Sequence, residues 1–199
     1  MPLLERLKFL MIFQSNQEEF FRVRMGILMH RALLEPENTD TLTGMRPDEQ
    51  IREILKVTKE QQTLTESVWK GIREELKANG VDVLDFKKIS KVDDLMSKKL
   101  FGDMKNTIVP TILDINQPLP FLWGEESYVI AFLGRNTEQK LAVIPLNRLP
   151  GYLTFEIEGC QKIVMTSQLI LHFLPLLLKK ETVMQSCVVK VTRNADVFL

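Results

Sequence analysis

The stretch Tyr128-Val-Ile-Ala-Phe-Leu133, followed by Leu141-Ala-Val-Ile144, decides the fold class of this 199-residue chain. Short apolar runs that are rich in β-branched and aromatic side chains are typical of strands. Between them, Gly134-Arg-Asn-Thr-Glu138 is typical of a hairpin connection. Further strands are predicted at Leu153–Ile157, Lys162–Met165 and Cys187–Val191. Strands joined by short connections predict an antiparallel sheet.

Two helices are expected to pack against this sheet. One is predicted from about Val92 to Met104, and an apolar one runs to Leu178 with Ser167 as a candidate N-cap. A sheet with helices to one side is an α+β layer. The fold class predicted for residues 81–199 is therefore α+β, with an antiparallel sheet and packed helices.

The first 80 residues have a helical pattern instead. Apolar residues recur at steps of three and four from Leu3 to Met11, which predicts a first helix. The polar run Gln14-Ser-Asn-Gln17 then interrupts the pattern. Ser15 or Asn16 could cap a second helix, which continues to Leu34, because their short polar side chains accept hydrogen bonds from a first helical turn.

A third helix completes this half of the chain. Residues 35–46 form a polar loop, and Pro47 is a favoured residue for a first helical turn. The apolar pattern then continues until Asn79-Gly80, where glycine can end a helix. These helices predict an antiparallel helical bundle over residues 1–80, ahead of a second domain over residues 81–199.

Composition excludes several classes of protein. The 26 Lys and Arg residues balance 26 Asp and Glu residues, so no overall positive field attracts nucleic acid. The two cysteines, Cys160 and Cys187, are too few for a disulfide framework and indicate a reducing compartment. Charged residues near the N-terminus argue against a signal peptide, and no apolar run is long enough for a membrane span. The expected location is cytoplasmic, with membrane association only as part of a larger assembly.

Residues that could carry out chemistry are few. The phosphate-binding patterns GxxxxGK[ST] and GxGxxG are absent from the sequence. The two histidines, His30 and His172, lack metal-ligand spacing. His172 lies in an apolar helix and is expected to be a core or interface residue with one hydrogen-bond partner. No catalytic residue and no metal ligand is therefore predicted.

One stretch near the N-terminus is more informative about function than the composition is. Phe9-Leu-Met-Ile-Phe-Gln-Ser-Asn-Gln-Glu-Glu-Phe-Phe-Arg-Val-Arg24 resembles the N-terminal signature of the large bacterial polyphosphate kinases. Eight positions match that signature: Phe9, Leu10, Ile12, Asn16, Glu19, Phe20, Val23 and Arg24. Gln17 and Glu18 replace the Leu and Asp that the family usually carries.

Three later segments resemble the same family in the same order. They are Val109–Leu122, which is rich in proline, Leu141–Pro150, and Val189-Lys-Val-Thr-Arg-Asn-Ala-Asp196. Departures include Gly151 and Lys190, where the family favours Arg. The resemblance covers essentially the whole chain and implies an N-terminal helical domain followed by a head domain.

The resemblance implies one site residue in this chain. The asparagine of the signature contacts the base of ATP in the family, and it matches Asn16. An amide has both a donor and an acceptor with which to contact a purine edge. The alternative is that Asn16 is an ordinary N-cap.

The resemblance places the remaining chemistry elsewhere. In the complete enzyme, the terminal phosphate of ATP passes to a histidine, which becomes phosphorylated, and then to polyphosphate. That histidine, the magnesium ligands and the basic residues for polyphosphate belong to C-terminal catalytic domains that this chain lacks. ATP and Mg are therefore expected to act in the complete enzyme, and neither is expected to bind tightly to this chain alone, which should be inactive.

Association and alternatives follow from the same resemblance. The head domain makes dimer contacts in the family, so a homo-oligomer is expected. Exposed apolar side chains on Leu3, Leu7 and Phe13 also predict self-association, because the family's first helix is missing here.

An alternative function is that of a stand-alone truncated relative, which acts as a non-catalytic binding or regulatory module. A third reading is a shared fold with a changed function.

Overall fold

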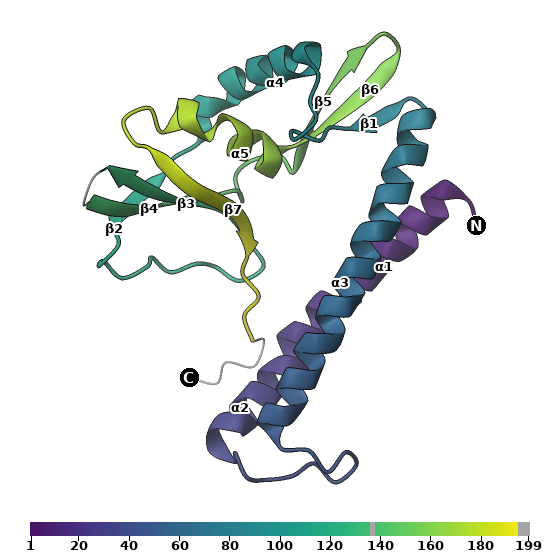
Figure 1. Cartoon of the computed structure of the whole chain (residues 1–199), viewed down its shortest axis with the longest axis vertical. Coiled ribbons are helices and arrows are strands. Elements are labelled where there is room, and N and C mark those ends of the chain that lie inside the picture. Colours follow the sequence, from purple (N-terminus) through teal and green to yellow (C-terminus); the bar gives the residue numbers. More distant parts are fainter. Residues whose placement is uncertain (136–137, 195–199) are drawn as a thin grey trace. The chain divides into compact units, whose positions relative to one another are not determined.

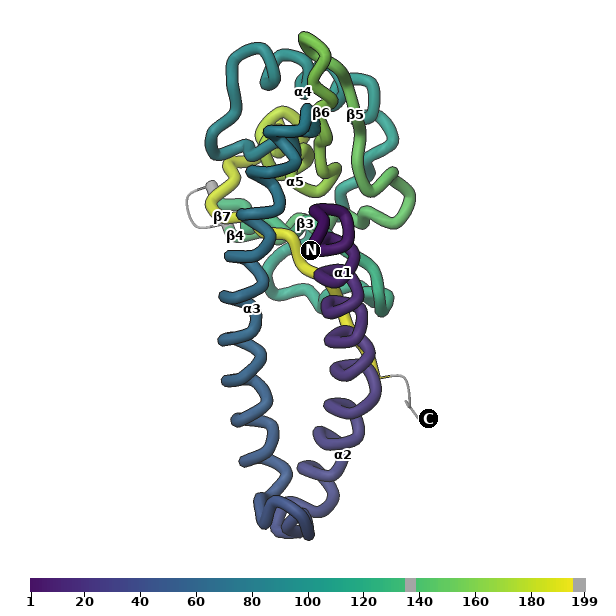
Figure 2. Tube along the Cα trace, turned by 90° about the vertical axis from the view of Figure 1, so that its right-hand side faces the viewer, coloured from purple at the N-terminus to yellow at the C-terminus, as the bar shows by residue number. Residues whose placement is uncertain are grey.

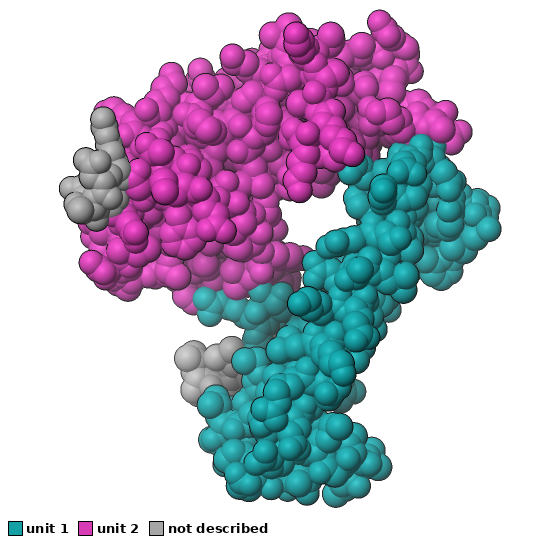
Figure 3. Space-filling model, in the orientation of Figure 1, with its two compact units in different colours: residues 1–76, 192–199 teal, residues 77–191 magenta. Residues whose placement is uncertain are grey.

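A computed structural model describes residues 1–135 and 138–194 of the chain. These residues form two compact units (Figure 3). A helical unit comprises Met1–Leu76 together with the residues from Thr192 onward, and a head unit comprises Lys77–Val191. Each unit is described separately below.

The helical unit is an antiparallel pair of long helical arms (Figures 1 and 2). The first arm consists of α1 (Leu3–Phe20), a π-helical segment η1 (Phe21–Met25) and α2 (Gly26–Leu34), and the second arm is α3 (Pro47–Ala78). Two cross-arm contacts give the antiparallel register. Arg6 donates a hydrogen bond to Glu75, and Gln17 Nε2 donates to Gln61 Oε1 over 3.4 Å.

The predicted helix boundary at Gln14–Gln17 was wrong. Ser15 and Asn16 lie inside α1, and neither caps a helix. The run contains no Gly or Pro to break the helix, and three of its polar residues are exposed while Gln17 contacts the second arm, so the run does not mark a helix end. The first 80 residues therefore hold two helical arms where three helices were predicted.

Local signals set the two ends of α3. Pro47 occupies the first position, and the carboxylate Oε2 of Glu49 accepts a hydrogen bond of 2.8 Å from the backbone N–H of Arg46. At the other end, Gly80 adopts a φ of +82°, and its N–H donates to the carbonyl of Lys77 over 3.1 Å. Glycine takes this left-handed conformation without a Cβ clash. The predicted start and end of this helix are confirmed.

The head unit contains two small sheets and two packed helices. The three-stranded sheet has the order β1 (Val81–Val83), β6 (Cys160–Met165) and β5 (Tyr152–Ile157). The four-stranded sheet has the order β2 (Thr111–Asp114), β4 (Glu138–Pro145), β3 (Ser127–Arg135) and β7 (Val183–Lys190). The helices are α4 (Lys91–Met104), which a short 3₁₀ turn η2 (Lys105–Thr107) follows, and α5 (Thr166–Leu177).

The α+β class is confirmed, with two corrections. The strands divide between two sheets, and β1 pairs with β6 in parallel, with Val81 opposite Gln161. All other strand pairs are antiparallel. The β3 and β4 pairing extends to Arg135 and Glu138, and residues 136–137 of the predicted hairpin connection lie outside the described residues.

The core of the head unit lies between α4, α5 and one face of the four-stranded sheet (Figure 1). Alternate residues of β3 and β4 point to the same face of the sheet, and five of them are buried there. They meet side chains from both helices: Val129, Ala131, Leu133, Ala142 and Ile144 from the strands, and Phe101, Leu169, Ile170, Phe173 and Leu174 from the helices. The apolar runs that predicted strands therefore form the core.

The start of α5 differs from the predicted one. The helix begins at Thr166, its N-cap position is Met165, and Ser167 does not cap it. The hydroxyl of Thr166 donates to the carbonyl oxygen of Pro150 over 2.5 Å instead. This contact ties the helix to the segment before β5.

Candidate functional site

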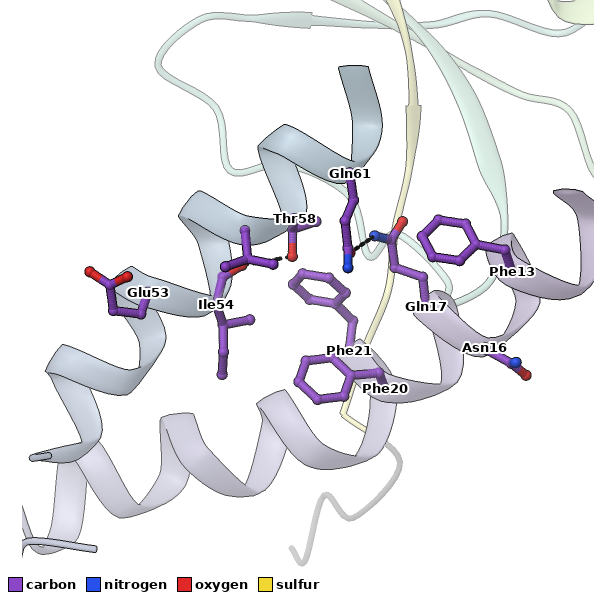
Figure 4. Close-up of a pocket in the computed structure, with 10 residues that line it drawn as sticks. Phe13, Asn16, Gln17, Phe20, Phe21, Glu53, Ile54, Thr58 and Gln61 are labelled. Carbon is purple, nitrogen blue, oxygen red and sulfur yellow. Dashed lines mark hydrogen bonds between the residues drawn. The ribbon is translucent and has the colours of Figure 1, made fainter. Parts of the chain in front are cut away.

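A groove of about 430 Å³ lies between the two arms of the helical unit (Figure 4). Side chains from α1 and the start of η1 line one wall, and side chains from α3 line the other. They are Phe13, Asn16, Gln17, Phe20 and Phe21 on the first arm, and Glu53, Ile54, Val57, Thr58 and Gln61 on the second. Residues three or four positions apart share one face of a helix, so this spacing produces a continuous wall on each arm.

The groove is largely apolar and aromatic. The rings of Phe20 and Phe21 meet edge to face, with centroids 5.8 Å apart. The amides of Gln17 and Gln61 bridge the arms beside these rings. The hydroxyl of Thr58 donates to the Ile54 carbonyl over 2.8 Å, within its own helix. The lining suits a planar or apolar group, and Glu53 is its charged residue.

Asn16 lies at the margin of this groove. Its side chain is exposed on α1 and, in Figure 4, points away from the space between the arms. Within residues 1–135 and 138–194, its amide has no hydrogen-bond partner. The amide donor and acceptor are therefore both available to a ligand.

Two arginines of the first arm are paired with glutamates. Arg22 Nη2 contacts Glu19 Oε2 over 2.7 Å. The hydrogen bond from Arg6 to Glu75 lowers the pKa of that glutamate and raises the pKa of the arginine. Phosphate groups need unpaired positive charge around them, and the lining of this groove supplies none.

The head unit contains a buried ion-pair network that the sequence did not reveal. Lys162 Nζ lies 3.0 Å from Asp82 Oδ2 and 3.6 Å from Asp93 Oδ1, and Lys77 Nζ lies 3.1 Å from Asp82 Oδ2. Burial alone would raise the pKa of Asp82, but hydrogen bonds from Lys162 and Lys77 lower it below its usual value. Burial opposes the charge on Lys162, and Asp82 raises its pKa in return. The network joins β1, β6, α4 and the end of α3, and we infer a structural role for it.

The remaining candidates for chemistry are separated from one another. His172 Nε2 lies 2.7 Å from Asp94 Oδ1, and its ring packs against Phe86 and Phe173 at centroid distances of 4.7 and 4.6 Å. The expected hydrogen-bond partner is present, but His172 is exposed on α5, so the expectation of a core position was wrong. Cys160 and Cys187 are free thiols. Among the described residues, no group of three His, Cys, Asp or Glu could hold a metal ion.

No helix in the described part of the chain combines the length and the apolar character that crossing a membrane requires. The helical arms are long enough for such a span, but both carry many charged residues.

Comparison with known proteins connects both units to one family. The family profile "Polyphosphate kinase N-terminal domain" matches residues 1–84, and "Polyphosphate kinase middle domain" matches residues 93–199. A polyphosphate kinase from an Exiguobacterium strain is 30% identical over 98% of this chain, and one from Staphylococcus haemolyticus is 28% identical over 98%. This chain spans 28% and 27% of the lengths of those two relatives.

A solved structure shares the fold. The crystal structure of polyphosphate kinase from Porphyromonas gingivalis superimposes on all of this chain with a TM-score of 0.79, at 21% sequence identity. The matched region is 30% of that protein's chain. The chain belongs to the polyphosphate kinase family, of which it carries the N-terminal and middle domains.

Proposed function

We propose that this chain is the part of a polyphosphate kinase that contacts the base of ATP through Asn16 and dimerises through its head unit. The reaction it serves is the reversible transfer of the terminal phosphate of ATP to polyphosphate. The groups that handle phosphate and magnesium lie, in this proposal, outside this chain. The isolated chain is therefore expected to be inactive.

The observation that carries the proposal is the position of Asn16. It lies inside α1, towards the end of that helix, so the alternative role of an N-cap does not apply. Its amide is exposed and has no partner within the described residues. Ile12 and Phe20, four positions before and after it, are exposed on the same face. An unpaired amide between apolar side chains suits a purine, which has a polar edge and flat apolar faces.

The proposed role of this chain does not extend to the phosphates. Mg²⁺ prefers oxygen ligands such as carboxylates, and the described residues lack a cluster that fits it. Phosphate binding also needs cations, and the lining of the groove contains neither Lys nor Arg. ATP is therefore expected to bind weakly here, through its base alone.

Titration with nucleotides tests the base contact. ATP is added at millimolar concentration to the ¹⁵N-labelled chain, and CTP and tripolyphosphate are added to separate samples. We expect the side-chain amide signal of Asn16 to move with ATP and to remain in place with CTP and tripolyphosphate. The shifts that ATP causes in neighbouring backbone signals should vanish in Asn16→Ala and persist in the control Ser15→Ala. Equal shifts with all three compounds, or shifts that survive in Asn16→Ala, would contradict the proposal.

Exposed aromatic residues support the dimer contact. Phe121 and Trp123 of the head unit are 61% and 64% exposed. Their rings pack edge to face at 5.0 Å beside a cavity of about 290 Å³ in the head unit. Exposed apolar side chains that form a contiguous patch mark protein interfaces more often than single exposed apolar side chains do.

Light scattering after gel filtration tests the dimer. The chain should elute as a dimer at micromolar concentration, and Phe121→Ser with Trp123→Ser should move it towards a monomer. The substitution Phe9→Ser, on the helical unit, is the control and should leave the dimer intact. A monomer at every concentration, or a dimer that only Phe9→Ser weakens, would refute the proposed role of the head unit.

A further inference from the structure

Gly26 has no room for a side chain. A Cβ atom added to it would lie 2.4 Å from both Cγ and Oδ1 of Asn194, and 2.8 Å from Nδ2. Carbon atoms in van der Waals contact lie much farther apart, so the Asn194 side chain occupies the space that any other residue would need at position 26. Both residues belong to the helical unit, although they lie at opposite ends of the sequence.

The other helical glycines differ from Gly26. An added Cβ at Gly71 in α3, or at Gly102 in α4, would meet no atom within 4 Å. Glycine is unfavourable inside a helix relative to alanine because it has more backbone freedom to lose on folding. A steric reason for glycine therefore exists at position 26 and is absent at positions 71 and 102.

The contact coincides with an irregular part of the first arm. Gly26 directly follows the π-helical segment η1, and its N–H donates to the carbonyl of Val23 instead of continuing the regular α-helical pattern. Met25 and Leu28, on either side of it, are buried, whereas α1 contains no buried residue. Asn194 is itself partly buried. The segment that follows β7 thus meets the helical arm where the arm is both irregular and buried.

We propose that Gly26 and Asn194 form a latch that docks the segment Thr192–Asn194 onto the first helical arm. The absence of a side chain at Gly26 leaves a space, and the side chain of Asn194 fills that space. The latch completes the helical unit with residues from the far end of the sequence. It also fixes this segment to the helical arm that carries Asn16. This proposal does not depend on the nucleotide contact.

The test measures whether Thr192–Asn194 is ordered. In the ¹⁵N-labelled chain, the backbone order parameters of these residues should be close to the value of about 0.85 that is typical of rigid backbone. In Gly26→Ala, the new methyl group displaces Asn194, and the order parameters should fall below about 0.6. Gly71→Ala is the matched control, because it makes the same change in a helix with open space, and it should leave Thr192–Asn194 ordered.

Two further variants keep the test decisive if Gly26→Ala disturbs the helix. Asn194→Ala leaves the helix untouched and should also release the segment. In the double variant Gly26→Ala with Asn194→Ala, the two effects should not add, because the new methyl group has no Asn194 side chain left to displace, whereas a general loss of helix stability would add to the release. The proposal is overturned if Thr192–Asn194 is mobile in the unchanged chain, or if it is as ordered in Gly26→Ala and Asn194→Ala as in Gly71→Ala.

Discussion

The helical unit and the head unit differ in how much apolar surface they bury. In the head unit, Val129, Leu169 and Leu174 are completely buried within one continuous core. In the described part of the helical unit, the buried large apolar side chains are Met25, Leu28, Ile72 and Leu76. Stabilisation by burial is roughly proportional to the apolar area removed from water. We infer that the head unit provides most of the stability, while the helical unit keeps its apolar side chains available for binding.

The largest predicted effect is a contrast between two leucines. Leu174 on α5 is 0% exposed, and Leu64 on α3 is 67% exposed. Leu174→Ala should lower the free energy of unfolding by about 3 to 5 kcal/mol because it leaves a cavity in the core. Leu64→Ala should change it by less than about 0.5 kcal/mol. Urea denaturation followed by circular dichroism measures both changes in the free energy of unfolding. Similar losses for the two substitutions would contradict the proposed difference between the units.

The next largest effect concerns the buried ion-pair network. Asp82→Asn removes the negative charge that Lys162 and Lys77 share, and leaves Lys162 with only its longer contact to Asp93. The free energy of unfolding should fall by about 2 kcal/mol, because a mostly buried charge loses its main partner. Asp103→Asn, at an exposed position of the same helix α4 as Asp93, is the control and should have little effect. Equal effects of the two substitutions would show that the network contributes no stability.

The same network predicts how stability depends on pH. The pKa of Asp82 is lowered from its usual 3.8, so its contribution is present above about pH 3.8 and is lost as the pH falls through the lower pKa of the folded state. The pKa of Lys162 is raised from 10.5, so its contribution is present below about pH 10.5 and is lost as the pH rises through the higher folded value. The melting temperature of the head unit should therefore fall at both extremes. In Asp82→Asn, the decrease in acid should be smaller, and an unchanged acid profile would argue against this assignment.

The smallest predicted effect is at Asn16. If the residue has no structural role, Asn16→Ala should leave the stability of the helical unit unchanged or raise it by about 0.5 kcal/mol, because alanine has the higher helix propensity. Loss of an N-cap would instead lower stability by about 1 kcal/mol. Thermal denaturation distinguishes the two signs, and a clear loss would favour a structural role over ligand contact.

Much of the fold could be predicted because its signals are local. The apolar runs at β3 and β4, and the proline and glycine that bound α3, act within a few residues of where they stand. The polar run within α1 misled the prediction, because exposed polar residues and a helix end have similar compositions. The class of the head unit followed from the short connections between its strands.

The features that could not be predicted depend on contacts between residues that are distant in sequence. The parallel pairing of β1 with β6 joins Val81 to Gln161, and the Asp82–Lys162 ion pair spans a similar separation. No feature of the sequence around Gly26 indicates a contact with Asn194. Asn16 was found through its resemblance to a family signature, since an exposed asparagine has no local pattern of its own.

The most direct test of the difference between the units uses the two tryptophans, since Trp69 lies in the helical unit and Trp123 in the head unit. Trp123→Phe leaves a chain whose fluorescence reports on the helical unit, and Trp69→Phe leaves one that reports on the head unit. Urea denaturation of each should give a lower midpoint for Trp69 than for Trp123, because the helical unit buries less apolar surface. Coincident midpoints, or a lower midpoint for Trp123, would contradict the conclusion that stability resides in the head unit.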